Sequence, residues 1–164
     1  MTTISLDAAV SAVPGISGED EATPRHWAVL EQHFMAQHGD RAAAHEAASE
    51  RVERCRQAMA LLREQRVSQG DNVKPLCELR PNGATLWQWV HLAEMAHAQL
   101  LAKRAAGDGE ALVLGIVAPA GGGKSTLVQV LKLLLRSLLG VSAVEELSLD
   151  DFLSSQAERA EQGI

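Results

Sequence analysis

The chain has 164 residues, of which 46% are hydrophobic, 22% charged and only 3% aromatic, and its formal net charge is −6 at pH 7. This length suits one ordinary domain with or without a helical extension, and the scarcity of aromatic residues disfavours a β-sandwich or barrel. The acidic balance argues against nucleic acid as a partner, because phosphate backbones are bound by basic surfaces.

The cysteines and the N-terminal residues indicate a cytoplasmic protein. Cys55 and Cys77 form no Cys-x-x-Cys pair, and reduced thiols are favoured over a lone disulfide. Residues 1–21 lack the basic region and apolar run of a secretory signal. The most apolar windows, 111–117 and 127–139, are too short to cross a bilayer. We therefore expect a soluble chain with no membrane partner.

The N-terminal two thirds of the sequence predict a tail and three helices. Residues 1–22 mix small and acidic residues with proline and glycine, which indicates a mobile tail. Thr23 and Pro24 supply an N-cap hydroxyl and a first-turn proline, and Gly39 ends the helix that they begin. Asp40 is placed to cap the next helix. The second and third helices are expected at about residues 41–67 and 84–105, with a loop over 71–83.

Both of the longer helices carry an apolar stripe at three- and four-residue spacing, so each is expected to bury one face. The stripe residues are Val52, Cys55, Met59 and Leu62 in the second helix, and Leu86, Trp89, Val90, Ala93, Ala96, Leu100 and Leu101 in the third.

The character of the sequence changes at Ala111. Residues 111–117 form a continuous apolar run, which is typical of a strand buried on both faces of a parallel sheet. A glycine-rich turn follows, then a helix over about 124–139 closed by Gly140, then a second apolar run at about 144–149. Strand, helix and strand make a βαβ unit.

The predicted fold class is therefore α/β, with a P-loop βαβ unit of an incomplete parallel sheet preceded by an all-α N-terminal region. The predicted division is a tail over 1–22, a helical region over 23–83, and the N-terminal part of a P-loop domain over 84–164.

The glycine-rich turn has the pattern of a loop that binds the phosphates of ATP. Its residues are Ala118, Pro119, Ala120, Gly121, Gly122, Gly123, Lys124 and Ser125, followed by Thr126. Glycines allow main-chain amides to approach phosphate oxygens at a helix N-terminus. Lys124 is expected to reach the β- and γ-phosphates, Ser125 to ligate Mg²⁺, and Thr126 to bond the α-phosphate.

The loop departs from the usual pattern at its first position, where Ala118 stands in place of glycine. Alanine is tolerable there if its φ is negative. The alternative interpretation is a turn that only joins a strand to a helix, although three consecutive glycines carry an entropic cost for such a role.

Asp150 and Asp151 are the second chemical feature, at the end of the second apolar run. A carboxylate there can hold Mg²⁺ through water or accept the proton of an attacking hydroxyl. We predict that Asp150 and Asp151 are catalytic together with Lys124, and that Asp150 and Ser125 contact the metal. The alternative is that the pair caps a helix.

Other candidate residues have simpler explanations. The six histidines include no i,i+4 pair suited to a helical metal site, so surface or packing roles are favoured. Trp87 and Trp89 are expected in the core. The arginines between residues 51 and 56 alternate with glutamates, which is typical of a solvated face.

Two segments resemble the D-glycerate 3-kinase family, which belongs with the uridine kinases, phosphoribulokinases and pantothenate kinases. Residues 114–127 are similar to its P-loop, which typically reads Ser-Ala-Pro-Gln-Gly-x-Gly-Lys-Thr-Thr-Leu. Residues 147–153 are similar to its Ser-x-Asp-Asp-Phe-Tyr-Leu, with Leu153 where tyrosine is usual. The resemblance covers roughly residues 86–156.

The resemblance implies an ATP-dependent kinase for a small hydroxylated metabolite, with Asp150 as the base and Asp151 assisting. The family's fold continues well beyond these motifs, so the chain is expected to be a fragment or truncated product. Glycerate is the first candidate acceptor, and another acceptor of the same kinase group is the alternative. A further alternative is a non-catalytic, nucleotide-binding module in which the helices of residues 23–105 bind a partner or self-associate.

Overall fold

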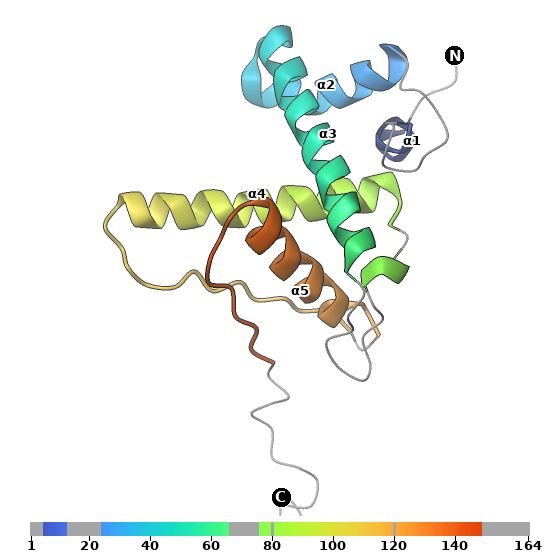
Figure 1. Cartoon of the computed structure of the whole chain (residues 1–164). Coiled ribbons are helices and arrows are strands. Elements are labelled where there is room, and N and C mark those ends of the chain that lie inside the picture. The colour runs from blue at the N-terminus through green and yellow to red at the C-terminus, as the bar shows by residue number, and fades with distance from the viewer. Residues whose placement is uncertain (1–4, 13–23, 66–75, 80, 120, 149–164) are drawn as a thin grey trace, which may run out of the picture.

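The computed structural model describes residues 5–12, 24–65, 76–79, 81–119 and 121–148, and its regular elements in these ranges are all helical (Figure 1). They are α1 (Leu6–Ser11), α2 (Pro24–His38), α3 (Arg41–Glu64), the 3₁₀-helix η1 (Leu76–Glu78), α4 (Gly83–Ala105), α5 (Lys124–Leu133) and the π-helical turn η2 (Leu134–Leu138).

The corner between α2 and α3 forms as the sequence predicts. α2 begins at Pro24, and Gly39 follows its last residue with a φ of +65°, a conformation that glycine adopts without strain. The Asp40 carboxylate then accepts a hydrogen bond of 3.0 Å from the amide of Ala43, which caps α3. Local residues therefore end one helix and begin the next within two positions.

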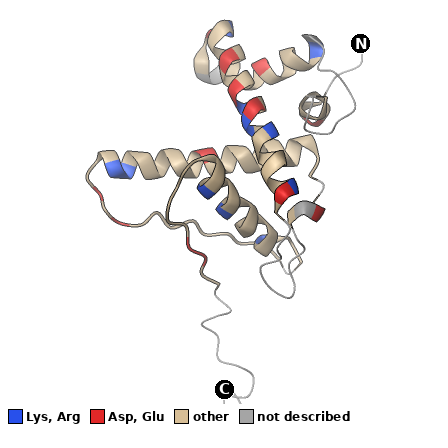
Figure 2. Cartoon of the chain, viewed as in Figure 1, with Lys and Arg blue, Asp and Glu red and all other residues tan. Residues whose placement is uncertain are grey.

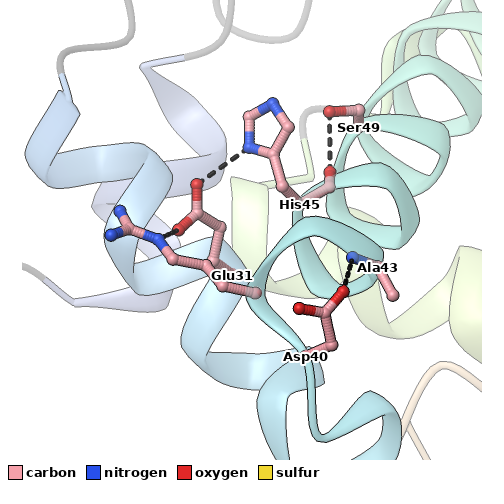
Figure 3. Close-up of polar contacts among 6 residues, drawn as sticks. Glu31, Asp40, Ala43, His45 and Ser49 are labelled. Carbon is pink, nitrogen blue, oxygen red and sulfur yellow. Dashed lines mark hydrogen bonds and ion pairs between the residues drawn. The ribbon is translucent and has the colours of Figure 1, made fainter.

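The same corner is held by an ion-pair cluster around Glu31, whose side chain is 11% exposed (Figure 3). Its carboxylate lies 2.8 Å from His45 Nδ1 and accepts a hydrogen bond of 3.0 Å from Arg41 Nε. The hydrogen bond from His45 and the Arg41 guanidinium together hold the pKa of Glu31 below its usual value, although burial acts in the opposite direction. Glu31 thus fastens α2 to the first turns of α3.

The core lies where α3 and α4 cross (Figure 1). All four stripe residues of α3 are buried, as predicted: Val52, Cys55, Met59 and Leu62. In α4 the stripe is buried at Leu86, Val90, Ala93 and Ala96, half-buried at Trp89 and Leu100, and exposed at Leu101. Trp87 is 2% exposed, so its predicted core position is confirmed.

Within the expected tail, the structure has a helix, α1, that packs against α2 and α4. Its Asp7 carboxylate accepts a hydrogen bond of 3.0 Å from the amide of Ala84, and Ser11 Oγ accepts one of 3.3 Å from the amide of Gly83. These two bonds satisfy amides at the start of α4, which Asn82 also caps by accepting from Thr85 N at 2.8 Å. Side chains from the beginning of the chain therefore complete a helix that starts more than 70 residues later.

The predicted α/β class is wrong for the part of the chain that the structure describes, because neither apolar run forms a strand. Val113 and Val117 are 85% and 95% exposed in the first run, and Leu147 is 82% exposed in the second. A strand needs neighbouring strands for its main-chain hydrogen bonds, and here helices fill the core while these runs pass along its surface. The last residue of the second run, Leu149, lies outside the described residues.

The helix between the two runs is confirmed. α5 begins at Lys124, continues through the π-helical turn η2, and is followed by Gly140 with a φ of +70°. Buried residues of α5 and η2, including Val130 and Leu134, join the core against α4 and α3. α4 therefore contacts α1 and α3, which precede the expected domain boundary at residue 84, and also α5, which follows it. Among the described residues, no helix is long and apolar enough to cross a membrane.

Candidate phosphate-binding site

The glycines of the predicted phosphate loop each occupy a position that demands glycine. Gly121 and Gly123 have φ angles of +74° and +76°, which side-chain-bearing residues rarely adopt. Gly122 donates a hydrogen bond of 3.0 Å to the carbonyl of Pro119, and a Cβ placed on it would lie 2.9 Å from that same oxygen. The three glycines therefore form a tight turn directly before α5.

The N-terminus of α5 is not capped by a side chain. Gly123 occupies the N-cap position, where serine, threonine or aspartate would ordinarily accept a first-turn amide, and it has no side chain to do so. The first helical hydrogen bond runs from Leu127 N to Gly123 O at 2.9 Å. The amides of Lys124, Ser125 and Thr126 precede this bond, so they carry the partial positive charge of a helix N-terminus. Such amides suit an anionic ligand.

The Lys124 ammonium folds back over the loop. Its Nζ donates to the carbonyl oxygens of Ala118 at 2.8 Å and Pro119 at 3.2 Å. These contacts tie the beginning of the loop to the first residue of α5. They also hold a positive charge beside the uncapped amides, so the loop concentrates positive potential in an acidic chain.

The predicted site residues fall into two groups. Ala118, Pro119 and residues 121–126 lie together in the turn and the first turn of α5. No described residue other than glycine has a positive φ, so the condition under which alanine is tolerable at position 118 is met. Ala120, Asp150 and Asp151 lie outside the described residues, so the structure does not test whether the acidic pair meets the loop.

The described residues supply donors for the phosphates of ATP more fully than they supply ligands for Mg²⁺. The loop offers main-chain amides and one ammonium, which is the donor set that phosphate oxygens require. For the metal, the described residues contain no group of three or more histidine, cysteine or acidic side chains that could hold an ion. Within the loop, the exposed Ser125 hydroxyl is the predicted metal ligand.

Sequence reasoning missed a second set of polar residues, at the junction of α2, α3 and α4. Arg51 was expected on a solvated face, and Figure 2 does show acidic and basic residues alternating along α3. However, the Arg51 side chain is only 11% exposed and forms an ion pair with Glu94 of α4, which is 13% exposed. The available signal was Glu94 itself, an acidic residue four positions after Val90 on the stripe of α4.

No protein-family model matches this chain, and no curated protein or solved structure matches it.

Proposed function

We propose that this chain binds the phosphates of Mg²⁺-ATP at residues 118–126 and serves ATP-dependent phosphoryl transfer to a small hydroxylated metabolite. The observation that carries the proposal is the combination at one turn of an uncapped helix N-terminus and the Lys124 ammonium. Either feature alone is common, but together they place main-chain donors and a cation around one small volume.

The loop residues have distinct roles in this proposal. The amides of residues 124–126 bind and orient the phosphate oxygens, and the absence of a Cβ on Gly122 keeps the turn tight. Lys124 exchanges its carbonyl contacts at Ala118 and Pro119 for a phosphate oxygen. The Ser125 hydroxyl is placed to ligate Mg²⁺, which supplies charge neutralisation to the phosphates when bound.

The acceptor chemistry rests on the resemblance and on the acidic pair. Asp150 would accept the proton of the acceptor hydroxyl, and Asp151 would assist with the metal or acceptor. D-glycerate is the first acceptor to test, and other acceptors of the uridine kinase, pantothenate kinase and phosphoribulokinase group follow. A cytoplasmic location accords with the supply of ATP.

A second candidate is favoured by the all-helical character of the described residues. In this alternative the chain binds nucleotide without turning it over, and the helical body of α1–α4 binds a partner or a second copy. The two candidates share the phosphate site and differ in whether ADP is released.

The first test measures Mg²⁺-ATP binding by calorimetry for the wild type, Lys124→Ala and Lys132→Ala. Lys132 is the matched control, because it lies in the last turn of the same helix. Losing one charge-assisted contact costs about 1.5–3 kcal/mol, so Lys124→Ala should bind about tenfold or more weakly, while Lys132→Ala should match the wild type. Equal binding by Lys124→Ala would reject the proposed role of Lys124.

A second pair of variants tests the loop without changing any charge. In Gly122→Ala the new Cβ meets the Pro119 carbonyl, so the turn must open and ATP affinity should fall. Gly115→Ala is the control, since a Cβ there has open space. Circular dichroism establishes that both variants keep their helices. If the two variants bind ATP alike, the turn geometry is not used for binding.

The same samples are then assayed for ADP release with D-glycerate. Glycerate-dependent release that is lost in Lys124→Ala supports the kinase. Binding without release from any acceptor of the group supports the non-catalytic module. A folded wild-type chain that does not bind Mg²⁺-ATP contradicts both.

A further inference from the structure

A nearly buried charge cluster joins α2, α3 and α4 away from the phosphate loop. Glu94 of α4 forms ion pairs with both Arg51 and Arg54 of α3. The Arg51 guanidinium also lies 4.8 Å from the ring centroid of Phe34 in α2 and 5.4 Å from that of Trp87 in α4. Arg51 therefore contacts all three helices, and aromatic faces replace part of its hydration.

The charge of Arg51 acts on two histidines, His33 and His91. His33 of α2 lies edge-to-face with Trp87, at 5.8 Å between ring centroids. His91 of α4 is one turn before Glu94, and its Nδ1 is buried without a hydrogen-bond partner in the described structure. Two donors of the same cluster, Arg51 Nε and Trp87 Nε1, are buried in the same way. His33 itself is exposed, whereas a proton added to His91 Nδ1 enters a poorly solvated region that already holds the Arg51 cation.

The local environment disfavours charge on both rings. Burial lowers the pKa of His33, and Arg51 and His91 lower it further. Burial and Arg51 likewise lower the pKa of His91, while Glu94 acts in the opposite direction. Both histidines are therefore neutral at pH 7, and Glu94 balances two guanidinium groups as the structure stands.

Several other charged groups of the packed elements have partners outside this cluster, while His38 of α2 lies against Phe34, with 6.0 Å between the ring centroids. On α1, Asp7 binds Ala84 N, and on α2, Glu31 binds Arg41 and His45. On α3, Glu50 lies 3.7 Å from Arg54 with a side chain that is 60% exposed, and burial raises the pKa of the Cys55 thiol to about 12.

The elements α5 and η2, which also pack against α4, contribute further positive charges. Lys124 and Arg136 donate to main-chain carbonyls there, and Lys132 lies in the last turn of α5. Among the described residues, Glu94 is thus the carboxylate that acts on His91, and no carboxylate acts on His33.

We propose that His33, Arg51, His91 and Glu94 form an acid-sensitive contact, in which protonation of the two histidines adds two cations beside Arg51 and releases α2 from α3 and α4. The contact is closed above about pH 6.5, the ordinary pKa of histidine, because the neutral rings add no further positive charge beside Arg51. As the pH falls below that value, the open form takes up protons first, and the closed contact loses stability as the pH passes through the lowered pKa values. The device is independent of the phosphate loop.

The test is hydrogen exchange of α2 amides at pH 7.5 and 5.5, corrected for the intrinsic rate, in the wild type, His33→Gln/His91→Gln and His97→Gln. His97 is the matched control, a half-buried histidine of the same helix α4. Linkage allows up to about tenfold per histidine per pH unit between the closed and open pKa values. We expect α2 opening in the wild type and the control to rise by about tenfold or more at the lower pH, while α5 changes little. The double variant should show no such rise.

Three results would overturn the proposal: α2 protection that does not change with pH, a double variant that responds like the wild type, or equal responses of α2 and α5. If the double variant does not fold, the wild type decides the question through histidine titration by NMR. His33 and His91 resonances must then titrate below about 6.5 and in step with α2 opening. Titration at the ordinary value, or without opening of α2, rejects the proposal.

Discussion

At the scale of single residues, the informative side chains are charged groups that lie at helix junctions with little exposure. Glu31 and Glu94 are 11% and 13% exposed; Glu31 contacts Arg41 and His45, and Glu94 pairs with Arg51 and Arg54. A carboxylate in this position is stabilised by charge-assisted hydrogen bonds, and removing its charge leaves the partners imperfectly satisfied. Each one therefore fixes how two helices meet.

Glu31→Gln should lower the free energy of unfolding by about 1 kcal/mol at pH 7, because the amide loses the ion pair with Arg41. Since the pKa of Glu31 is lowered in the folded chain, its contribution is present above the ordinary value of 4.5 and is lost as the pH falls through the folded pKa. Urea unfolding between pH 7 and pH 3 measures both effects.

Glu46→Gln is the matched control for this change, an exposed glutamate on the same helix α3 as Arg41 and His45. The wild type and the control should lose more stability than Glu31→Gln between pH 5 and pH 3. Parallel pH profiles for all three proteins would show that Glu31 contributes no charge-dependent stability.

At the scale of elements, the docking of α1 on the start of α4 depends on one glycine. A Cβ on Gly83 would lie 2.7 Å from both Ser11 N and Ser11 Oγ, and 2.9 Å from the Asp7 carbonyl. Main-chain atoms cannot move away as a flexible side chain can. The approach of the two helices is therefore set by the absence of a side chain at this position.

Gly83→Ala should destabilise the chain by about 1–3 kcal/mol and raise the hydrogen exchange of α1. The direction of this change in stability is diagnostic, because alanine in place of glycine ordinarily stabilises a helix by about 0.5–1 kcal/mol. Asp7→Ala, which removes the acceptor of the Ala84 amide, should produce the same local release, and the two changes together should cost less than their sum. Added stability in Gly83→Ala, or full additivity, would contradict the docking of α1.

At the scale of the whole molecule, the helices bury one apolar face each of α3, α4 and α5 and leave two apolar runs at the surface. Hydrophobicity predicts that a segment gains by burial, but the available partners decide whether it is buried. Residues 111–117 have helices beside them and no strand in the described chain. Leu112 and Ile116 pack against the core, while Val113 and Val117 face solvent.

A matched pair of valines tests this arrangement. Val117→Thr should change the free energy of unfolding by no more than about 0.5 kcal/mol, because Val117 is 95% exposed. Val130→Thr should cost about 1–3 kcal/mol, because Val130 is fully buried and the new hydroxyl loses water. Chemical unfolding of both variants gives the comparison. A cost at position 117 equal to that at 130 would show that the first run is buried after all.

The sequence by itself determined the features that depend on neighbours within a few residues. These features are the helix start at Pro24, the corner at Gly39 and Asp40, the buried stripe of α3, and the glycine turn before Lys124. Caps, positive φ angles and helical periodicity act over one or two turns, so they can be identified without knowing the fold.

Only the tertiary structure decided the features that depend on residues far apart in the chain. Asp7 binds Ala84 across 77 positions, and Arg54 meets Glu94 across 40. In the candidate site, the turn was predictable, but the contacts of Lys124 with the Ala118 and Pro119 carbonyls were not. The same holds for the apolar run after Ala111: its hydrophobicity is a property of the sequence, whereas strand formation requires a neighbouring strand, and the described fold provides helices instead.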